Sequence, residues 1–187
     1  MGTGHKEAIL AAAKRTAMAH GYGGLNFRDL AAEVGIKAAS VYYHFPGKAE
    51  LGVAVARRYW EDIVADLEAI ADKTSDPLVH LNRYPEIFRK SLQNDNRMCL
   101  SSFMTAEYAD LPEAVKDEVL KFADVNVAWL SRALTAAGTV KTVDREGRAR
   151  AIYAAVAGAQ LMARGRADIS MFDSLIENYR ASGLLLA

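Results

Sequence analysis

Six apolar side chains recur every three or four residues between residues 51 and 70, and this regular stripe most constrains the fold. The stripe consists of Leu51, Val55, Tyr59, Ile63, Leu67 and Ile70. Side chains at this spacing lie on one face of an α-helix, so the stripe predicts a long amphipathic helix after Pro46 and Gly47. Nowhere does the chain show the sustained alternation of apolar and polar residues that a half-buried strand requires. We therefore expect an all-α fold.

Shorter patterns of the same period predict the helices before the stripe. The first is expected over residues 6–20 and the second over residues 26–33, where the side chain of Asn26 can cap the first turn. Gly35 then permits a sharp turn that a β-carbon would resist, and a short third helix is expected over residues 38–44.

Further helical patterns follow the stripe and bring the expected total to about nine. They cover residues 78–92, 98–109, 112–138 and 144–163, with a last helix after Ser170. Pro85 is expected to kink or split the first of these. Asp144 is placed to cap the alanine-rich helix, and Ser170 with Asp173 resembles a capping box for the last one.

Charge is unevenly distributed along the chain although the 187 residues carry no net charge. Residues 1–58 hold eight Lys and Arg against four Asp and Glu, whereas the rest of the chain holds 15 against 19. A basic N-terminal part can face phosphates while the acidic remainder faces water. This asymmetry keeps a nucleic-acid partner possible despite the neutral total.

The composition also bears on the cell compartment. No run of roughly 18 apolar residues is present, which excludes a membrane span, and the polar start is not followed by an apolar signal core. The single cysteine, Cys99, cannot form an internal disulfide, as expected in a reducing compartment. We therefore expect a cytoplasmic protein.

The stretch from Asn26 to Lys48 resembles the helix-turn-helix of the TetR family of transcriptional regulators. The matching residues are Asn26, Arg28, Ala31, Gly35, Tyr42, His44, Phe45 and Lys48. Two positions depart from the pattern, since Lys37 replaces a serine or threonine cap and Ala38 replaces a basic residue. The base preference of the family therefore does not carry over.

The resemblance implies two domains and three kinds of partner. Residues 1–50 would form a three-helix DNA-binding domain, and residues 51–187 a larger α-helical domain for effector binding and dimerisation. The partners would be a double-stranded DNA operator, a small apolar or aromatic effector, and a second copy of the chain bound through the last two helices. A face of Ala151, Ala155, Ala159 and Ala163 would allow close helix approach, unless it packs inside one subunit.

Seven residues around the third helix are predicted to contact DNA. Arg28, Lys37 and Ser40 are candidates for base edges, because an arginine can form two hydrogen bonds with guanine. Hydroxyl, imidazole and ammonium groups suit phosphate oxygens, so Tyr42, Tyr43, His44 and Lys48 are expected to contact the DNA backbone. The alternative is an ordinary solvated helix face with one aromatic residue buried.

Aromatic and sulfur-containing residues recur through the later helices and could line an apolar effector site with a few polar groups. The predicted effector contacts are Tyr84, Phe88, Cys99, Phe103, Met104, Glu107, Trp129 and Tyr153. Asn126 and Gln160 are further polar candidates. For any one aromatic residue, plain core packing is the alternative.

Cys99 suggests a sharper hypothesis. It is expected to open a helix, with Arg97 two residues earlier, and both features favour a thiolate. A cysteine near this position resembles that of TetR-like regulators responding to electrophiles and oxidants, although Met98 stands where that subgroup prefers glycine. A buried, inert thiol is the alternative.

Catalytic chemistry has little support in the sequence. His5, His20, His44 and His80 show no H-E-x-x-H or other ligand spacing, so no catalytic residue, metal or cofactor is expected. Two other functions remain open: an all-α small-molecule binding protein or enzyme with a vestigial DNA-binding head, and a DNA-binding structural dimer without an effector.

Overall fold

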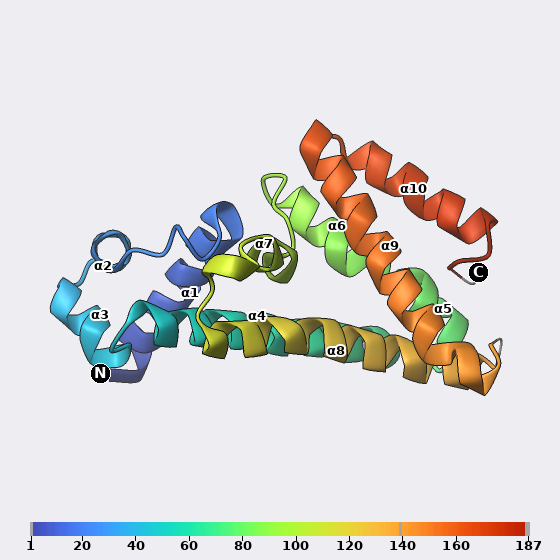
Figure 1. The fold of residues 1–187 in the computed structure, drawn as a ribbon, viewed down its shortest axis with the longest axis horizontal. Coiled ribbons are helices and arrows are strands. Elements are labelled where there is room, and N and C mark those ends of the chain that lie inside the picture. Colours follow the sequence, from blue (N-terminus) through green and yellow to red (C-terminus); the bar gives the residue numbers. More distant parts are fainter. Residues whose placement is uncertain (1, 139, 186–187) are drawn as a thin grey trace. The chain divides into compact units, whose positions relative to one another are not determined.

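All regular elements in the part of the chain that the structure describes, residues 2–138 and 140–185 of a computed structural model, are helical (Figure 1). The α-helices are α1 (Gly2–His20), α2 (Phe27–Val34), α3 (Ala38–His44), α4 (Lys48–Ala71), α5 (Pro77–Arg83), α6 (Pro85–Gln93), α7 (Leu100–Ala106), α8 (Glu113–Ala137), α9 (Arg145–Arg166) and α10 (Ile169–Ala181). Two short 3₁₀ helices, η1 (Tyr108–Asp110) and η2 (Thr142–Asp144), precede α8 and α9. The predicted all-α fold is confirmed.

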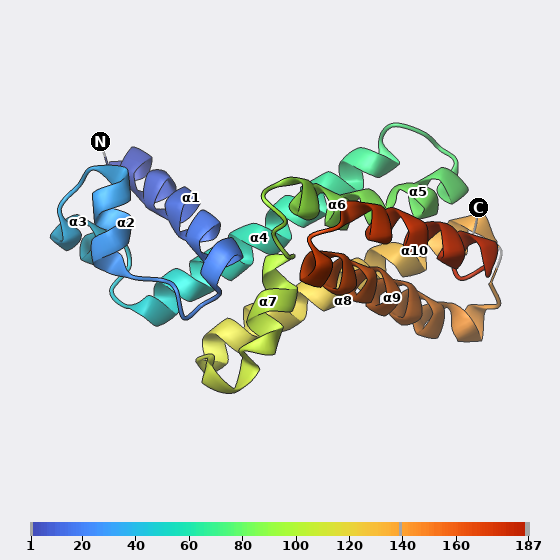
Figure 2. The same cartoon turned by 90° about the horizontal axis from the view of Figure 1, so that it is seen from above.

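The helices form two compact units, and each unit is built from two separate stretches of the chain. The first contains residues up to 60 together with residues 100–121, and the second contains residues 61–99 together with those from 122 onward. The first unit thus holds α1–α3, α7, η1 and parts of α4 and α8. In the second unit α9 and α10 pack side by side (Figure 2). The predicted DNA-binding segment, residues 1–50, falls within the first unit.

Two local sequence signals correctly predict where α2 begins and ends. Asn26 Oδ1 accepts hydrogen bonds from the amides of Arg28 (2.8 Å) and Asp29 (3.3 Å), as predicted for a cap. Gly35 ends α2 in the left-handed conformation (φ 74°), which glycine adopts without strain. Lys37 precedes α3 without a side-chain cap.

The cap predicted at Asp144 is correct in position only, since Asp144 directly precedes α9 but makes no side-chain bond to it. The capping box predicted for the last helix is wrong. The cap of α10 is Asp168, whose carboxylate accepts the amide of Ser170 at 2.9 Å, whereas Asp173 forms an ion pair with Arg89 of α6 at 2.7 Å. Asp173 therefore pairs with a residue distant in the sequence, although local spacing assigned its side chain to a capping box.

The apolar stripe of α4 is buried along its whole length. Its six residues are at most 7% exposed. In the first unit, Leu51 and Val55 belong to the same core as Ile9 of α1, Leu30 of α2 and Val41 of α3, all fully or almost fully buried. Pro85 splits the helical pattern over residues 78–92 into α5 and α6, which is one of the two outcomes predicted for this proline.

A buried carboxylate joins α4 to α8 within the first unit. Glu118, only 3% exposed, accepts hydrogen bonds from Arg57 (2.7 Å), Trp60 (2.8 Å) and Lys121 (2.9 Å). Burial by itself raises the pKa of a carboxyl group, but these three bonds outweigh it and lower the pKa of Glu118 from 4.5 to about 2. The carboxylate therefore stays ionised at neutral pH.

We predict that Glu118→Gln lowers the free energy of unfolding by about 2 kcal/mol at pH 7, because a neutral amide cannot replace charge-assisted bonds. Since the folded-state pKa lies below the unfolded value, this stabilisation is present above pH 4.5 and is lost as the pH falls toward 2. Urea unfolding across this pH range measures the difference between the two proteins.

Glu113→Gln is the matched control for this prediction. Glu113 lies on the same helix but pairs with Lys116 at the surface, where an ion pair contributes little. Equal destabilisation by both substitutions, or a pH-independent difference for Glu118→Gln, would contradict the assignment.

Candidate nucleic-acid interface

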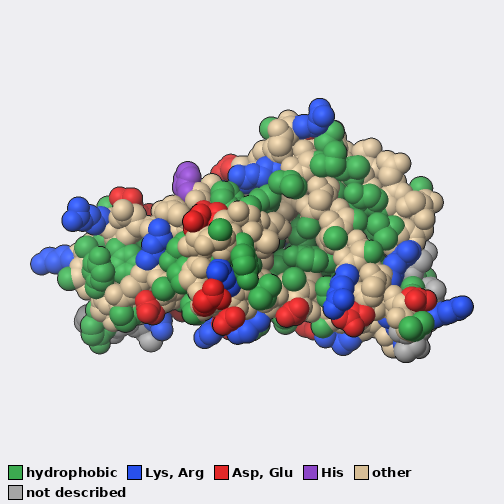
Figure 3. All heavy atoms as spheres, in the orientation of Figure 1, with side chains coloured by type: hydrophobic (Ala, Val, Ile, Leu, Met, Phe, Trp, Pro, Cys, Tyr) green, Lys and Arg blue, Asp and Glu red, His purple; other side chains and the backbone are tan. Residues whose placement is uncertain are grey.

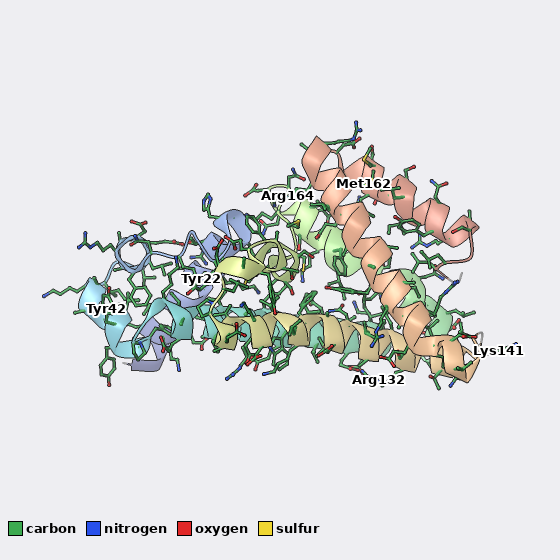
Figure 4. All side chains as sticks on the ribbon, in the orientation of Figure 1. Tyr22, Tyr42, Arg132, Lys141, Met162 and Arg164 are labelled. Carbon is green, nitrogen blue, oxygen red and sulfur yellow. The ribbon has the colours of Figure 1, made fainter. Side chains whose placement is uncertain are left out.

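Helix α3 is packed on one side and open on the other. Val41 is fully buried and Phe45, directly after the helix, is 3% exposed, whereas Tyr42 and Tyr43 are 56% and 83% exposed. Tyr42 rests against Phe27, with ring centroids 4.7 Å apart (Figure 4). The buried side fixes the helix, so the polar ends of both tyrosines are available for intermolecular contacts.

The seven predicted DNA contacts lie on α2, α3 and the start of α4. Arg28 and Lys37 are exposed like the two tyrosines, while Ser40, His44 and Lys48 are partly buried. In Figure 3, Lys and Arg side chains project from the end of the first unit that carries α2 and α3. None of the seven belongs to the hydrophobic core.

Three of these residues surround one cleft at the start of α2. Arg28, Tyr42 and Lys48 line it together with Leu25, Asn26 and Phe27, and its volume is about 310 Å³. A guanidinium, a phenol and an ammonium group therefore converge from three helices. All three are suitable donors to phosphate oxygens.

Lys48 also has a role inside the protein. Its Nζ donates to the carbonyl oxygen of Gly23 at 2.9 Å and lies 4.9 Å from the centre of the Tyr22 ring. The ammonium group thereby holds the turn between α1 and α2. Because an ammonium has three N–H donors, this bond leaves others for a phosphate.

The second unit gathers four of the eight predicted effector contacts into one aromatic cluster. Tyr84 stacks on Trp129 with centroids 6.0 Å apart and lies 5.7 Å from Phe88, which in turn lies 6.3 Å from Tyr153. Sequence reasoning missed two further members, His80 beside Trp129 and Phe122 beside Tyr153. His80 lies four residues before Tyr84, and Phe122 lies seven residues before Trp129. Each spacing places the two residues on the same helix face.

The side-chain amides of Asn126 and Gln160 are buried beside this cluster and form hydrogen bonds with it or with nearby backbone. The hydroxyl of Tyr84 donates to Asn126 Oδ1 at 2.9 Å. Gln160 donates to the carbonyl oxygen of Phe88 at 2.7 Å and accepts the amide of Cys99 at 3.0 Å. Asn126 and Gln160 are fully buried, so their amides have partners inside the protein rather than facing solvent.

Burial raises the pKa of Tyr84 well above its ordinary value, and the neighbouring Tyr153 and Cys99 add to the effect. The pKa of Tyr153 is likewise raised by burial and then by Cys99. Both phenols therefore stay neutral at physiological pH. The cluster is a buried group of aromatic rings with neutral hydroxyl groups.

Phe103, Met104 and Glu107 lie in the first unit and are not part of this cluster. Glu107 accepts the backbone amides of Tyr22 at 2.7 Å and Gly23 at 3.2 Å. Cys99 belongs to the second unit and is 2% exposed, and α7 begins one residue after it rather than at it. Arg97 pairs with Asp95 at 3.7 Å.

Among the described residues, no group of three or more His, Cys, Asp or Glu side chains could hold a metal ion. No helix in the same residues is long and apolar enough to cross a membrane.

Comparison with known proteins points to one class. Residues 9–55 match the family described as bacterial regulatory proteins, tetR family. A TetR transcriptional regulator from Legionella pneumophila shares 28% identity and superposes with a TM-score of 0.87, covering 95% of this chain and 96% of its own. A TetR-family regulator from Agrobacterium tumefaciens shares 24% identity with a TM-score of 0.89, covering 97% and 98%. Among curated proteins, no sequence matches this chain.

The fold and the helix-turn-helix thus define a DNA-binding regulator of transcription. The chain carries the N-terminal domain of the tetR family and has the TetR-family fold throughout, as the resemblance between Asn26 and Lys48 predicted.

We predict that Arg28→Ala weakens binding to a specific duplex by about 1–3 kcal/mol while changing binding to a random duplex much less, because a base-reading arginine distinguishes sequences. Fluorescence anisotropy on both duplexes measures the two losses. Arg15→Ala is the control, since Arg15 carries the same charge in the same unit but pairs with Glu33 at 2.6 Å. Equal losses on both duplexes for Arg28→Ala would exclude base reading.

Proposed function

We propose that the chain is a homodimeric transcriptional repressor that a small apolar or aromatic effector releases from a near-palindromic operator. The observation that carries the proposal is the two-sided α3, which buries Val41 while presenting Tyr42 and Tyr43 to solvent beside a cleft with Arg28 and Lys48. A short helix fixed on one side and polar on the other suits insertion into the major groove.

In this proposal the seven contacts divide into two groups. Arg28, Lys37 and Ser40 read base edges, and Tyr42, Tyr43, His44 and Lys48 hold phosphates. Support for the second group comes from the convergence of Tyr42 and Lys48 on one cleft. Phosphate contacts fix the register of the protein on DNA without distinguishing sequences.

The proposed dimer forms through α9 and α10, but not through the alanine face expected from the sequence. Ala159 and Ala163 of that face are fully buried within the chain. The outward face of α9 keeps only Ala151 of that set and adds Ala154, Gly158, Leu161, Met162 and Gly165. Apolar side chains are visible over α9 and α10 in Figure 3.

The composition of this outward face suits close approach of a second helix. Leu161 and Met162 are 59% and 52% exposed. A β-carbon added at Gly158 or Gly165 would meet nothing within 4 Å, so neither glycine is needed for packing inside the chain. Each glycine costs about 1 kcal/mol relative to alanine in a helix, which a tight helix–helix contact across a two-fold axis would offset.

The aromatic cluster of Tyr84, Phe88, Trp129 and Tyr153 is the proposed place for the effector in the second unit. Its phenols are neutral and its surface is aromatic, so an uncharged aromatic molecule fits better than an anion. Cys99, Phe103, Met104 and Glu107 remain predicted contacts.

Release from DNA would be a shift between two conformations. The effector favours the one in which the two α3 helices of the dimer are wrongly spaced for the operator. Helix α4 is the proposed lever, because its residues belong partly to one unit and partly to the other. Linkage is reciprocal, so operator DNA must weaken effector binding by the same factor.

Selection of bound duplexes from a random pool tests the proposed function. We expect a near-palindromic consensus whose half-sites lie about one helical turn apart, roughly 34–36 Å, because two α3 helices must enter successive major grooves. Recovery of no consensus, or of an asymmetric single half-site, would contradict a dimeric sequence-specific regulator.

A second prediction concerns the dimer. Met162→Asp should raise the dimer dissociation constant at least about a hundredfold, because it buries an unpaired charge in an apolar interface. Sedimentation at several concentrations measures the shift from twice 20.4 kDa to the single chain. Leu120→Asp is the matched control, since Leu120 is also 52% exposed but lies on α8 in the first unit. A dimer weakened equally by both substitutions would argue against α9.

A further inference from the structure

The turn between α1 and α2 is held by a carboxylate from far along the chain. The consecutive amides of Tyr22 and Gly23 donate to Glu107 Oε2 at 2.7 Å and Oε1 at 3.2 Å. Glu107 lies between α7 and η1, 85 residues from Tyr22, and all of these residues belong to the first unit. Each oxygen of the carboxylate thus accepts one backbone amide.

The local sequence is suited to this contact. Gly21 ends α1 in the left-handed conformation (φ 69°), and a β-carbon there would lie 2.3 Å from Glu107 Oε2. The backbone angle favours glycine at this position, and a β-carbon would displace the carboxylate from the two amides. A glutamine could accept only one of the two amides, because its NH₂ group would face the other donor.

The other side of the same turn contacts α4. Lys48 donates to the carbonyl oxygen of Gly23 at 2.9 Å. A β-carbon at Gly52 would lie 2.6 Å from the Tyr22 ring and 3.1 Å from Val115, so the absence of a side chain lets the ring pack closely. Glu107 and Lys48 together fix a turn that ends where α2 begins.

We propose that Glu107 is a positioning residue for the DNA interface. It fixes the α1–α2 turn, and through that turn the start of α2 and the ammonium group of Lys48, without touching DNA itself. The inference rests on the proposed DNA-binding function and assigns to Glu107 a role other than the effector contact expected from its sequence position.

The position of Glu107 gives this contact a regulatory consequence. The segment that ends at Glu107 also carries Phe103 and Met104, two predicted effector contacts on α7. A shift of this segment would pull the carboxylate from the amides of Tyr22 and Gly23. The turn would then lose its orientation, and α2 would lose the fixed starting point that the DNA interface needs.

Glu107→Gln in the full-length protein tests the proposal by two measurements. Hydrogen–deuterium exchange at residues 18–27 should become faster, because two amides lose their shared acceptor. Affinity for the consensus duplex selected by the wild-type protein should fall about tenfold, as for substitutions that act without contacting the ligand.

Asp110→Asn is the control, because it removes the same charge from an exposed residue three positions further on. It should leave exchange at the turn and duplex affinity within twofold of wild type. Glu107→Asp keeps the charge on a shorter side chain and should give intermediate values for both measurements. It also serves as the test protein if Glu107→Gln does not fold.

Two results would overturn the proposal: unchanged exchange at the turn, or faster exchange with unchanged consensus affinity. The second would show that the contact is only local. Failure of the proposed function is seen separately, because a wild-type protein that selects no consensus reveals it before any variant is compared.

Discussion

Burial of a single face of α4 is the constraint on which the rest of the structure depends. Its stripe from Leu51 to Ile70 supplies apolar side chains to the cores of both compact units. In the first unit, burial of this stripe together with Val41 and Phe45 fixes the orientation of α3. Tyr42 and Tyr43 therefore remain exposed. The exposed surface of α3, the proposed DNA-reading helix, therefore follows from apolar packing on its opposite side.

Two carboxylates explain why residues 100–121 belong to the same unit as the N-terminal helices. Glu118 accepts three side-chain donors from α4 and α8, and Glu107 accepts two backbone amides from the α1–α2 turn. The first contact is buried and stabilises the fold, with the pKa of Glu118 lowered to about 2. The second holds a turn beside the proposed DNA interface. Similar side chains thus serve stability in one place and positioning in another.

Sequence patterns predicted features whose cause is local. Asn26 caps α2, Gly35 ends it, and Pro85 splits a helical pattern, because each depends on the backbone within a few residues. The capping box at Ser170 failed for the opposite reason, since Asp173 pairs with Arg89, 84 residues away. The alanine set of α9 is divided, with Ala159 and Ala163 buried and Ala151 exposed, because equal spacing cannot tell which small residues pack inside the chain.

Periodicity and turn residues act over short distances, so they predict the helices, the all-α class and the seven candidate DNA contacts from the sequence alone. Tertiary packing decides which distant groups meet. It placed Glu107 on the amides of Tyr22 and Gly23, separated Phe103 and Met104 from the aromatic cluster, and brought Arg28 and Lys48 to one cleft. Such meetings depend on how whole helices pack, and no local pattern carries that information.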